Sequence, residues 1–103
     1  MATDKEYLYF ILEQLSELDN ITYIKMMGEY IIYFRGKITA YVCDNRFLVK
    51  PVEAAKKLLP NAVIEPPYDG AKDMILVDNL DDKEFLRQLF IAMYPELPEK
   101  KKK

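Results

Sequence analysis

Histidine is absent from this 103-residue sequence, and only one cysteine, Cys43, is present. The lack of histidine excludes a Ser-His-Asp triad, cysteine–histidine chemistry and every metal site that needs an imidazole ligand. A single cysteine excludes an internal disulfide and any zinc or iron–sulfur site built from several cysteines. No convincing set of acid, base and nucleophile remains, so we expect a protein without catalytic residues, metal or cofactor.

Long apolar runs are also missing. No stretch of the sequence approaches the roughly 20 apolar residues that a membrane span requires. The segment Met1–Lys5 has neither the basic nor the apolar region of a signal peptide. We therefore expect a cytoplasmic protein that does not contact a membrane.

Charge is low overall but unevenly distributed. The net charge is −2, and without the terminal run Lys100–Lys103 only 11 basic residues would face 17 acidic ones. Such an acidic body repels a phosphate backbone on average. Residues 20–50 differ, because their basic residues outnumber Glu29 and Asp44. This basic stripe is most simply a solvated face, and the alternative is a surface for nucleic acid or an acidic partner. Its members are Lys25, Arg35, Lys37, Arg46 and Lys50.

Hydrophobic periodicity predicts a helix followed by a four-stranded meander. Residues Tyr7, Ile11, Leu15 and Leu18 share one helical face, and Thr3–Glu6 reads as its capping box. We expect this helix to end at Asp19-Asn20. Runs of β-branched and aromatic residues then predict strands at 22–27, 29–34, 37–43 and 46–49. Two-residue separations at 35–36 and 44–45 favour tight hairpins.

The second half predicts a short helix, a loop and a final helix. The helix covers 52–59, and the loop, rich in Pro and Gly, covers 60–72 and includes a short strand at 62–65. A further strand at 74–77 precedes a last helix capped by Asn79 or Asp81. The predicted class is α+β, with an antiparallel sheet, helices mainly on one side and the order α-β(3–4)-α-β(1–2)-α. We expect one domain at 1–95 and a disordered Lys-rich tail at 96–103.

Several short motifs together resemble the TfoX N-terminal domain family. The motifs are Lys25-Met26-Met27-Gly28-Glu29-Tyr30, Ile32-Tyr33, Gly36-Lys37, Asp44, Leu48-Val49-Lys50 and Pro67-Tyr68. The resemblance spans roughly residues 5–95. It implies a fold like that of secretion chaperones, and relatives linked to transcription regulation, natural competence and DNA transformation. The full-length regulators carry a second, C-terminal domain, which we expect this chain to lack. The family supplies no catalytic residues to transfer.

The segment from Lys25 to Tyr30 is the strongest local signature. As structure, it reads as a corner between strands in which Gly28 adopts a backbone angle that other residues avoid. As function, it reads as a corner that contacts a partner through an adaptable methionine surface. Tyr68 similarly pins a loop or forms the wall of a pocket. The candidate interaction residues are Lys25, Met26, Met27, Gly28, Glu29, Tyr30, Arg35, Lys37, Arg46, Lys50 and Tyr68.

Other polar groups have structural readings. We expect Cys43 to be a buried thiol, and the acidic cluster Asp78–Glu84 to stabilise the start of the last helix.

The strand Tyr30–Phe34 is apolar on both faces, and a short chain with few helices cannot cover both faces of its sheet without a second subunit. The favoured hypothesis is a non-enzymatic module that contacts proteins and forms a homodimer. A nucleic-acid-binding protein and a small-molecule-binding domain with a pocket beside Pro66–Gly70 remain the alternatives.

Overall fold

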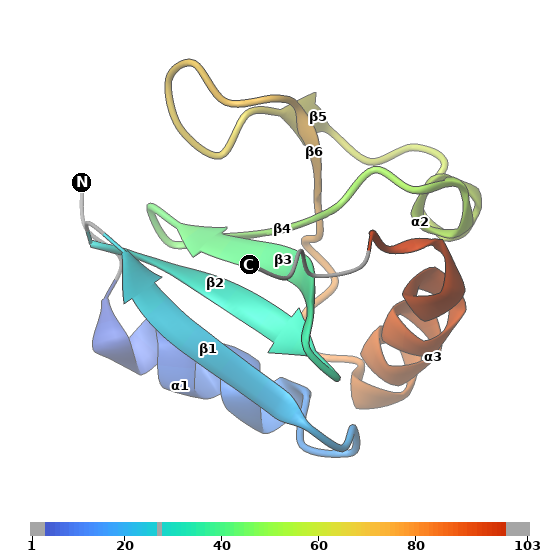
Figure 1. The fold of residues 1–103 in the computed structure, drawn as a ribbon, viewed down its shortest axis with the longest axis horizontal. Coiled ribbons are helices and arrows are strands. Elements are labelled where there is room, and N and C mark those ends of the chain that lie inside the picture. The colour runs from blue at the N-terminus through green and yellow to red at the C-terminus, as the bar shows by residue number, and fades with distance from the viewer. Residues whose placement is uncertain (1–3, 27, 99–103) are drawn as a thin grey trace.

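The structure is a computed structural model that describes residues 4–26 and 28–98. In chain order, its elements are α1 (Lys5–Gln14), β1 (Ile21–Met26), β2 (Glu29–Phe34), β3 (Lys37–Cys43), β4 (Arg46–Val49), α2 (Glu53–Leu58), β5 (Ile64–Glu65), β6 (Met74–Leu76), α3 (Lys83–Met93) and a 3-10 turn, η1 (Tyr94–Glu96). Within these residues the strands form one antiparallel six-stranded sheet, in the order β1-β2-β3-β4-β6-β5 (Figure 1). The predicted α+β class is confirmed.

The meander follows the predicted strands closely because its turns need unusual backbone angles that the sequence supplies. Arg35 and Gly36 have φ of 52° and 84°, and Asp44 and Asn45 have φ of 53° and 56°. Two successive positive values are typical of the hairpin turns whose twist matches the flanking strands. Gly28, with φ of 86°, makes the corresponding corner between β1 and β2. The sheet's register shift lies elsewhere, between Ile32 and Tyr33.

The helices cover one face of the sheet, which holds the hydrophobic core. In Figure 1, α1 passes behind β1 and β2, and its buried side chains Leu8, Ile11 and Leu15 join the core cluster. The Phe90 ring of α3 lies 6.0 Å from Phe34 and 6.2 Å from Phe47, measured between ring centroids. These aromatic contacts tie the final helix to β2 and β4.

Helix boundaries differ from the prediction in several places, including α2, which covers Glu53–Leu58 and not 52–59. The helix α1 ends at Gln14, before Asp19-Asn20, because the bonds from Ser16 N–H to Glu13 and from Leu18 N–H to Leu15 tighten its end into turns. The cap of α3 is Asp82, whose carboxylate accepts a hydrogen bond from Phe85 N–H at 3.0 Å, and not Asn79 or Asp81. Asp4 begins α1 without a side-chain cap, and Thr3 lies outside the described residues.

The packed chain also extends past the boundary expected at residue 95. The Glu96 carboxylate accepts a hydrogen bond from Ala54 N–H at 2.8 Å, where the start of α2 lacks a side-chain cap of its own. Leu97 is only 4% exposed and belongs to the core. The expected tail therefore does not begin at residue 96, because two contacts distant in sequence hold this segment. Residues 99–103, with the terminal lysines, lie outside the described part of the chain.

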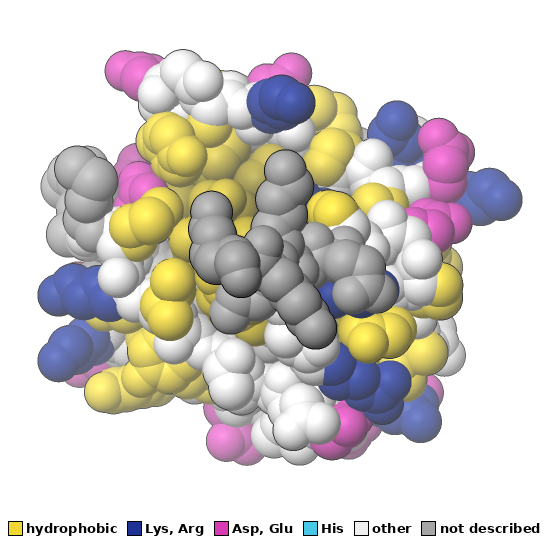
Figure 2. All heavy atoms as spheres, in the orientation of Figure 1, with side chains coloured by type: hydrophobic (Ala, Val, Ile, Leu, Met, Phe, Trp, Pro, Cys, Tyr) yellow, Lys and Arg dark blue, Asp and Glu magenta, His cyan; other side chains and the backbone are white. Residues whose placement is uncertain are grey.

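The opposite face of the sheet, called the open face below, turns away from α1. Register places Ile24, Ile31, Tyr41, Leu48 and Leu76 in one row across it. The loop from 66 to 73, which joins β5 to β6, reaches the middle of this row: the Tyr68 and Tyr41 ring centroids are 6.5 Å apart. Figure 2 shows hydrophobic side chains gathered on this face.

No helix within the described residues is long and apolar enough to cross a membrane.

Candidate functional site

Two hollows lie beside each other under the β5–β6 loop, and Tyr68 lines both. The first, called the acidic hollow, measures about 330 Å³ and is lined by the carboxylates Glu29, Asp44 and Asp69 together with Arg46. The second, called the lysine hollow, measures about 230 Å³. Its lining includes Tyr41, Lys50, Tyr68, Lys72 and Met74. The alternative of a small-molecule-binding domain placed a pocket beside Pro66–Gly70, and two hollows lie there.

Arg46 holds the loop in place. Its Nη1 donates to Glu65 Oε2 at 2.6 Å, and its Nη2 donates to the carbonyl oxygen of Pro67 at 2.8 Å. A third, longer contact of 3.4 Å joins Nη1 to the carbonyl oxygen of Pro66. Charge-assisted hydrogen bonds of this kind are among the stronger polar contacts in proteins. Both terminal nitrogens of the guanidinium are therefore occupied by the chain itself, whereas its buried Nε has no partner among the described residues. The acidic hollow presents mainly its carboxylates.

Cys43 lies next to the acidic hollow but is chemically quiet. Its side chain is fully buried, and the strand pairs place it opposite Arg46. Burial, followed by the charge and hydrogen bonding of Glu29, raises the pKa of the Cys43 thiol to about 12. The thiol therefore stays protonated near neutral pH, where a nucleophile would need to be a thiolate. Its expected role as a buried structural cysteine fits this environment.

Tyr41 is the second titratable group with a shifted pKa in this region. Burial raises the pKa of its hydroxyl, and the neighbouring Tyr68, Cys43, Tyr33 and Glu29 act in the same direction. The hydroxyl therefore stays neutral across the physiological range and can donate or accept hydrogen bonds. Within residues 4–26 and 28–98, no three His, Cys, Asp or Glu side chains gather in a way that could hold a metal ion.

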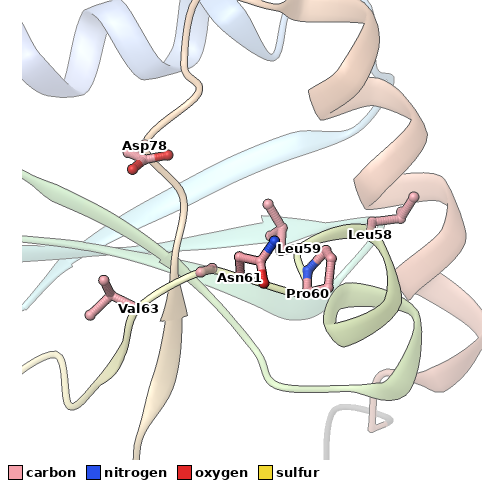
Figure 3. A pocket seen from close by; sticks show the side chains of 7 residues that line it. Leu58, Leu59, Pro60, Asn61, Val63 and Asp78 are labelled. Carbon is pink, nitrogen blue, oxygen red and sulfur yellow. The ribbon is translucent and has the colours of Figure 1, made fainter.

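A third hollow, of about 270 Å³, lies between the α2–β5 connection and the chain after β6 (Figure 3). Figure 3 shows Leu58, Leu59 and Val63 around it, with Asp78 on the far side. Asp78 is the single charged group of its lining. Ligand sites usually combine an apolar wall with several convergent polar groups, so this hollow is the weaker candidate.

The fold disperses the basic stripe predicted between residues 20 and 50. Arg35 pairs with Asp19 at 2.9 Å and lies over the Phe34 ring, at the β2–β3 turn. Lys37 lies 4.3 Å above the Tyr94 ring centroid. Arg46 is at the opposite end of the sheet, beside the β3–β4 turn. Alternation along strands and reversal at each hairpin separate residues that are close in sequence.

The segment from Lys25 to Tyr30 is likewise divided. Lys25 and Met26 are exposed at the end of β1, whereas Tyr30 is buried in the core and Glu29 faces the acidic hollow. Met27 lies outside the described residues. Tyr68 is the candidate whose place is clearest, because it contacts Tyr41 and separates the two hollows.

Two features escaped the sequence reasoning. Lys72 lies in the lysine hollow, but in sequence it is an ordinary loop lysine, and only the nearby Pro66-Pro67-Tyr68 signalled a structured loop. The exposed strand β1 was the other omission. The residues of β1 are typical of a strand, but no local sequence pattern indicates that this strand lies at the edge of the sheet.

The chain is similar to a known protein of a spirochaete over almost its whole length. An uncharacterized 12.7 kDa protein in the trpE 5' region of Spirochaeta aurantia is 34% identical over 107 aligned residues, which cover 99% of this chain and 93% of the relative. The chain belongs to the family of this spirochaete protein. No family model and no solved structure matches the chain. The resemblance to the TfoX N-terminal domain family therefore stays a prediction.

Proposed function

We propose that the protein is a non-enzymatic interaction module that acts by protein–protein contact and forms a homodimer through β1. The observation that carries this proposal is the uncovered edge of the sheet. All six residues of β1 pair with β2, and among the described residues no strand pairs with its other side. Long uncovered edges are unusual in monomeric proteins because they attract further strands.

The backbone of β1 is arranged for strand addition. The carbonyl oxygen of Asn20 accepts a hydrogen bond from Arg35 N–H, so the alternating backbone groups of Ile21, Tyr23 and Lys25 point away from β2. The neighbouring side chains add apolar surface: Tyr23 is 41% exposed, Ile24 48% and Met26 38%. An added strand would form hydrogen bonds with these outward-pointing backbone groups and would cover the exposed apolar side chains.

A second copy of this chain fits the edge because the pattern is self-complementary. A two-fold axis through Tyr23 pairs Tyr23 with its equivalent and Ile21 with Lys25 of the second copy, and each such pair exchanges two backbone hydrogen bonds. The same register sets Ile24 beside Thr22 of the second copy on the open face. The helix α1 passes behind β1 and β2 (Figure 1), and its exposed side chains Tyr9 and Phe10 offer further apolar area.

The regulatory part of the proposal rests on the resemblance to TfoX-type competence regulators. A dimeric module without catalytic residues would act by holding a partner protein, and the partner's identity is left to a pull-down from the native cells. Nucleic-acid binding receives less support, because the basic stripe is dispersed and two of its members, Arg35 and Arg46, are paired within the chain.

Light scattering after size-exclusion chromatography tests the dimer. We expect the mass of two chains at tens of micromolar, and the mass of one chain for Ile24→Lys, because two lysines would then lie diagonally across the axis. The matched control is Ile91→Lys, on α3 and 45% exposed, which should remain dimeric. A wild-type protein that is monomeric throughout this range would end the proposal. So would equal dissociation by both variants.

A further inference from the structure

The lysine hollow combines features that the acidic hollow and the hollow beside Asp78 lack. Lys50, Lys72, Tyr41 and Tyr68 line its volume of about 230 Å³, and buried Met74 closes its floor. The sheet supplies one wall and the β5–β6 loop supplies the other. The strand β2 lies between the β1 edge and Tyr41 of β3, and no residue of β1 lines the hollow.

The loop that forms the outer wall is held at several points. Arg46 anchors Glu65 and the carbonyl of Pro67. Farther along, Ala71 N–H donates to the carbonyl oxygen of Tyr68 at 3.1 Å, which closes a turn beside the hollow. The Tyr68 ring rests against Tyr41. A wall fixed in this way lowers the ordering cost of binding, since little of the site must rearrange.

The charges of the hollow are unbalanced. The side chains of Lys50 and Lys72 make no hydrogen bond or ion pair with any residue of the described chain, whereas Arg35, Arg46 and Lys83 each pair with a carboxylate. The lining contains one carboxylate, Asp73, against these two lysines. A half-enclosed site with an excess positive charge attracts an anion, and the low-dielectric walls strengthen the attraction.

The remaining lining favours a ligand with a flat apolar body. The Tyr41 and Tyr68 rings are tilted by 45° to each other, and Pro51, Ala71 and Met74 add apolar surface. The hydroxyl groups of Tyr41 and Tyr68 can donate hydrogen bonds to an anion. The volume lies just below the roughly 300–1,000 Å³ typical of sites for drug-sized ligands, so only a small molecule fits.

We propose that the lysine hollow binds a small single-ring anion, with its carboxylate or phosphate on Lys50 and Lys72 and its ring against Tyr41 and Tyr68. The proposal is for binding alone and includes no reaction. Such a ligand would make this family member an interaction module whose loop surface responds to a metabolite.

Titration followed by two-dimensional NMR of the ¹⁵N-labelled full chain tests this site. The probes are benzoate and phenyl phosphate, with benzyl alcohol lacking the charge and inorganic phosphate lacking the ring. We expect one of the two aromatic anions to shift the amides of Lys50, Ala71 and Lys72 in a saturable way at millimolar concentration. Benzyl alcohol and inorganic phosphate should each bind about tenfold more weakly.

Variants separate a built site from general attraction by lysines. Lys50→Met and Lys72→Met should each weaken binding about tenfold. The matched control Lys57→Met, on the exposed side of α2, should leave binding unchanged. The proposal is overturned by shifts that do not saturate, by equal affinity for either truncated probe, or by equal effects of the three variants. Dimer mass, measured on the same samples, reports separately on the β1 edge.

Discussion

The two edges of the sheet are protected in opposite ways. β5 contains only Ile64 and Glu65, and the loop that follows it is fastened by Arg46. β1 is six residues long, and its exposed side chains include Tyr23, Ile24 and Met26. A two-residue edge offers too few backbone groups to template another strand, whereas β1 offers a full row. The comparison teaches that the protein closes one edge itself and leaves the other without a neighbouring strand among the described residues.

Removing the contacts of Arg46 with Glu65 and the Pro67 carbonyl, called the Arg46 clamp, should destabilise the loop beside β5. We expect Arg46→Met to lower the free energy of unfolding by about 1–3 kcal/mol, because it leaves Glu65 and the Pro67 carbonyl without their donor. Arg87→Met, which removes an exposed pair with Glu84, should cost less than about 0.5 kcal/mol. Urea unfolding measures both.

Hydrogen exchange locates the same effect. The amide of Leu76, which donates to the carbonyl of Val63, should exchange faster in Arg46→Met, while β1 amides that face β2 keep their rates. Equal acceleration at both edges would contradict a clamp that acts locally.

Cys43 lies on β3, between the two edges of the sheet. Because its thiol is buried, we expect the free energy of unfolding to fall in alkali. An unfolded chain releases the thiol proton near pH 9, whereas the folded chain keeps it to about pH 12, so alkali favours the unfolded state. The stability from this group is complete below pH 9 and declines by up to about 1.4 kcal/mol per pH unit above it. Urea unfolding at pH 8 and pH 10 should show a steeper decline for wild type than for Cys43→Ala. Tyrosines titrate in both proteins, so their contribution cancels when the two declines in unfolding free energy are compared. Equal declines in wild type and Cys43→Ala would mean that the sheet around Cys43 opens readily to solvent.

Gly70 tests how firmly the loop beside β5 is held. Its φ is +86°, and a Cβ added there would meet no atom within 4 Å, so Gly70→Ala reports backbone strain alone. Gly36, with φ of +84° and equally open space, is the matched site in the β2–β3 hairpin. We expect each alanine to cost about 1 kcal/mol in unfolding free energy. A much smaller cost at Gly70 would show a loop that relaxes, and the two edges would then differ less than proposed.

The smallest effect is expected from Val63→Lys. Val63 is 54% exposed beside β5 and therefore matches Ile24 in exposure. Because β5 is too short to template a strand, this lysine should leave the mass of the dimer unchanged in light scattering. If Val63→Lys dissociates the protein and Ile24→Lys does not, the roles of the two edges are reversed.

Local sequence signals sufficed for most elements. The hairpins at 35–36 and 44–45 follow from the two-residue separations of the strands and from Gly36, Asp44 and Asn45, which tolerate positive φ. The alternation in Lys37–Cys43 gives the strand and its two faces. Local sequence signals did not identify the helix caps, because contacts between distant segments compete with local capping. Asp82, and not its neighbour Asp81, caps α3, and Glu96 caps α2 from the far end of the chain. The candidate site was predicted only in part: Tyr68 was named, but Lys72 was not.

The sequence by itself determined what this protein lacks and where its strands turn, because those properties depend on residue types and on backbone angles within a few residues. It also determined the α+β class, through the change of hydrophobic period after residue 20. Tertiary structure alone decided which strands became edges and which lysines line the same hollow as Tyr41. Edge position and cavity lining depend on pairings between segments far apart in the chain, and no local pattern records them.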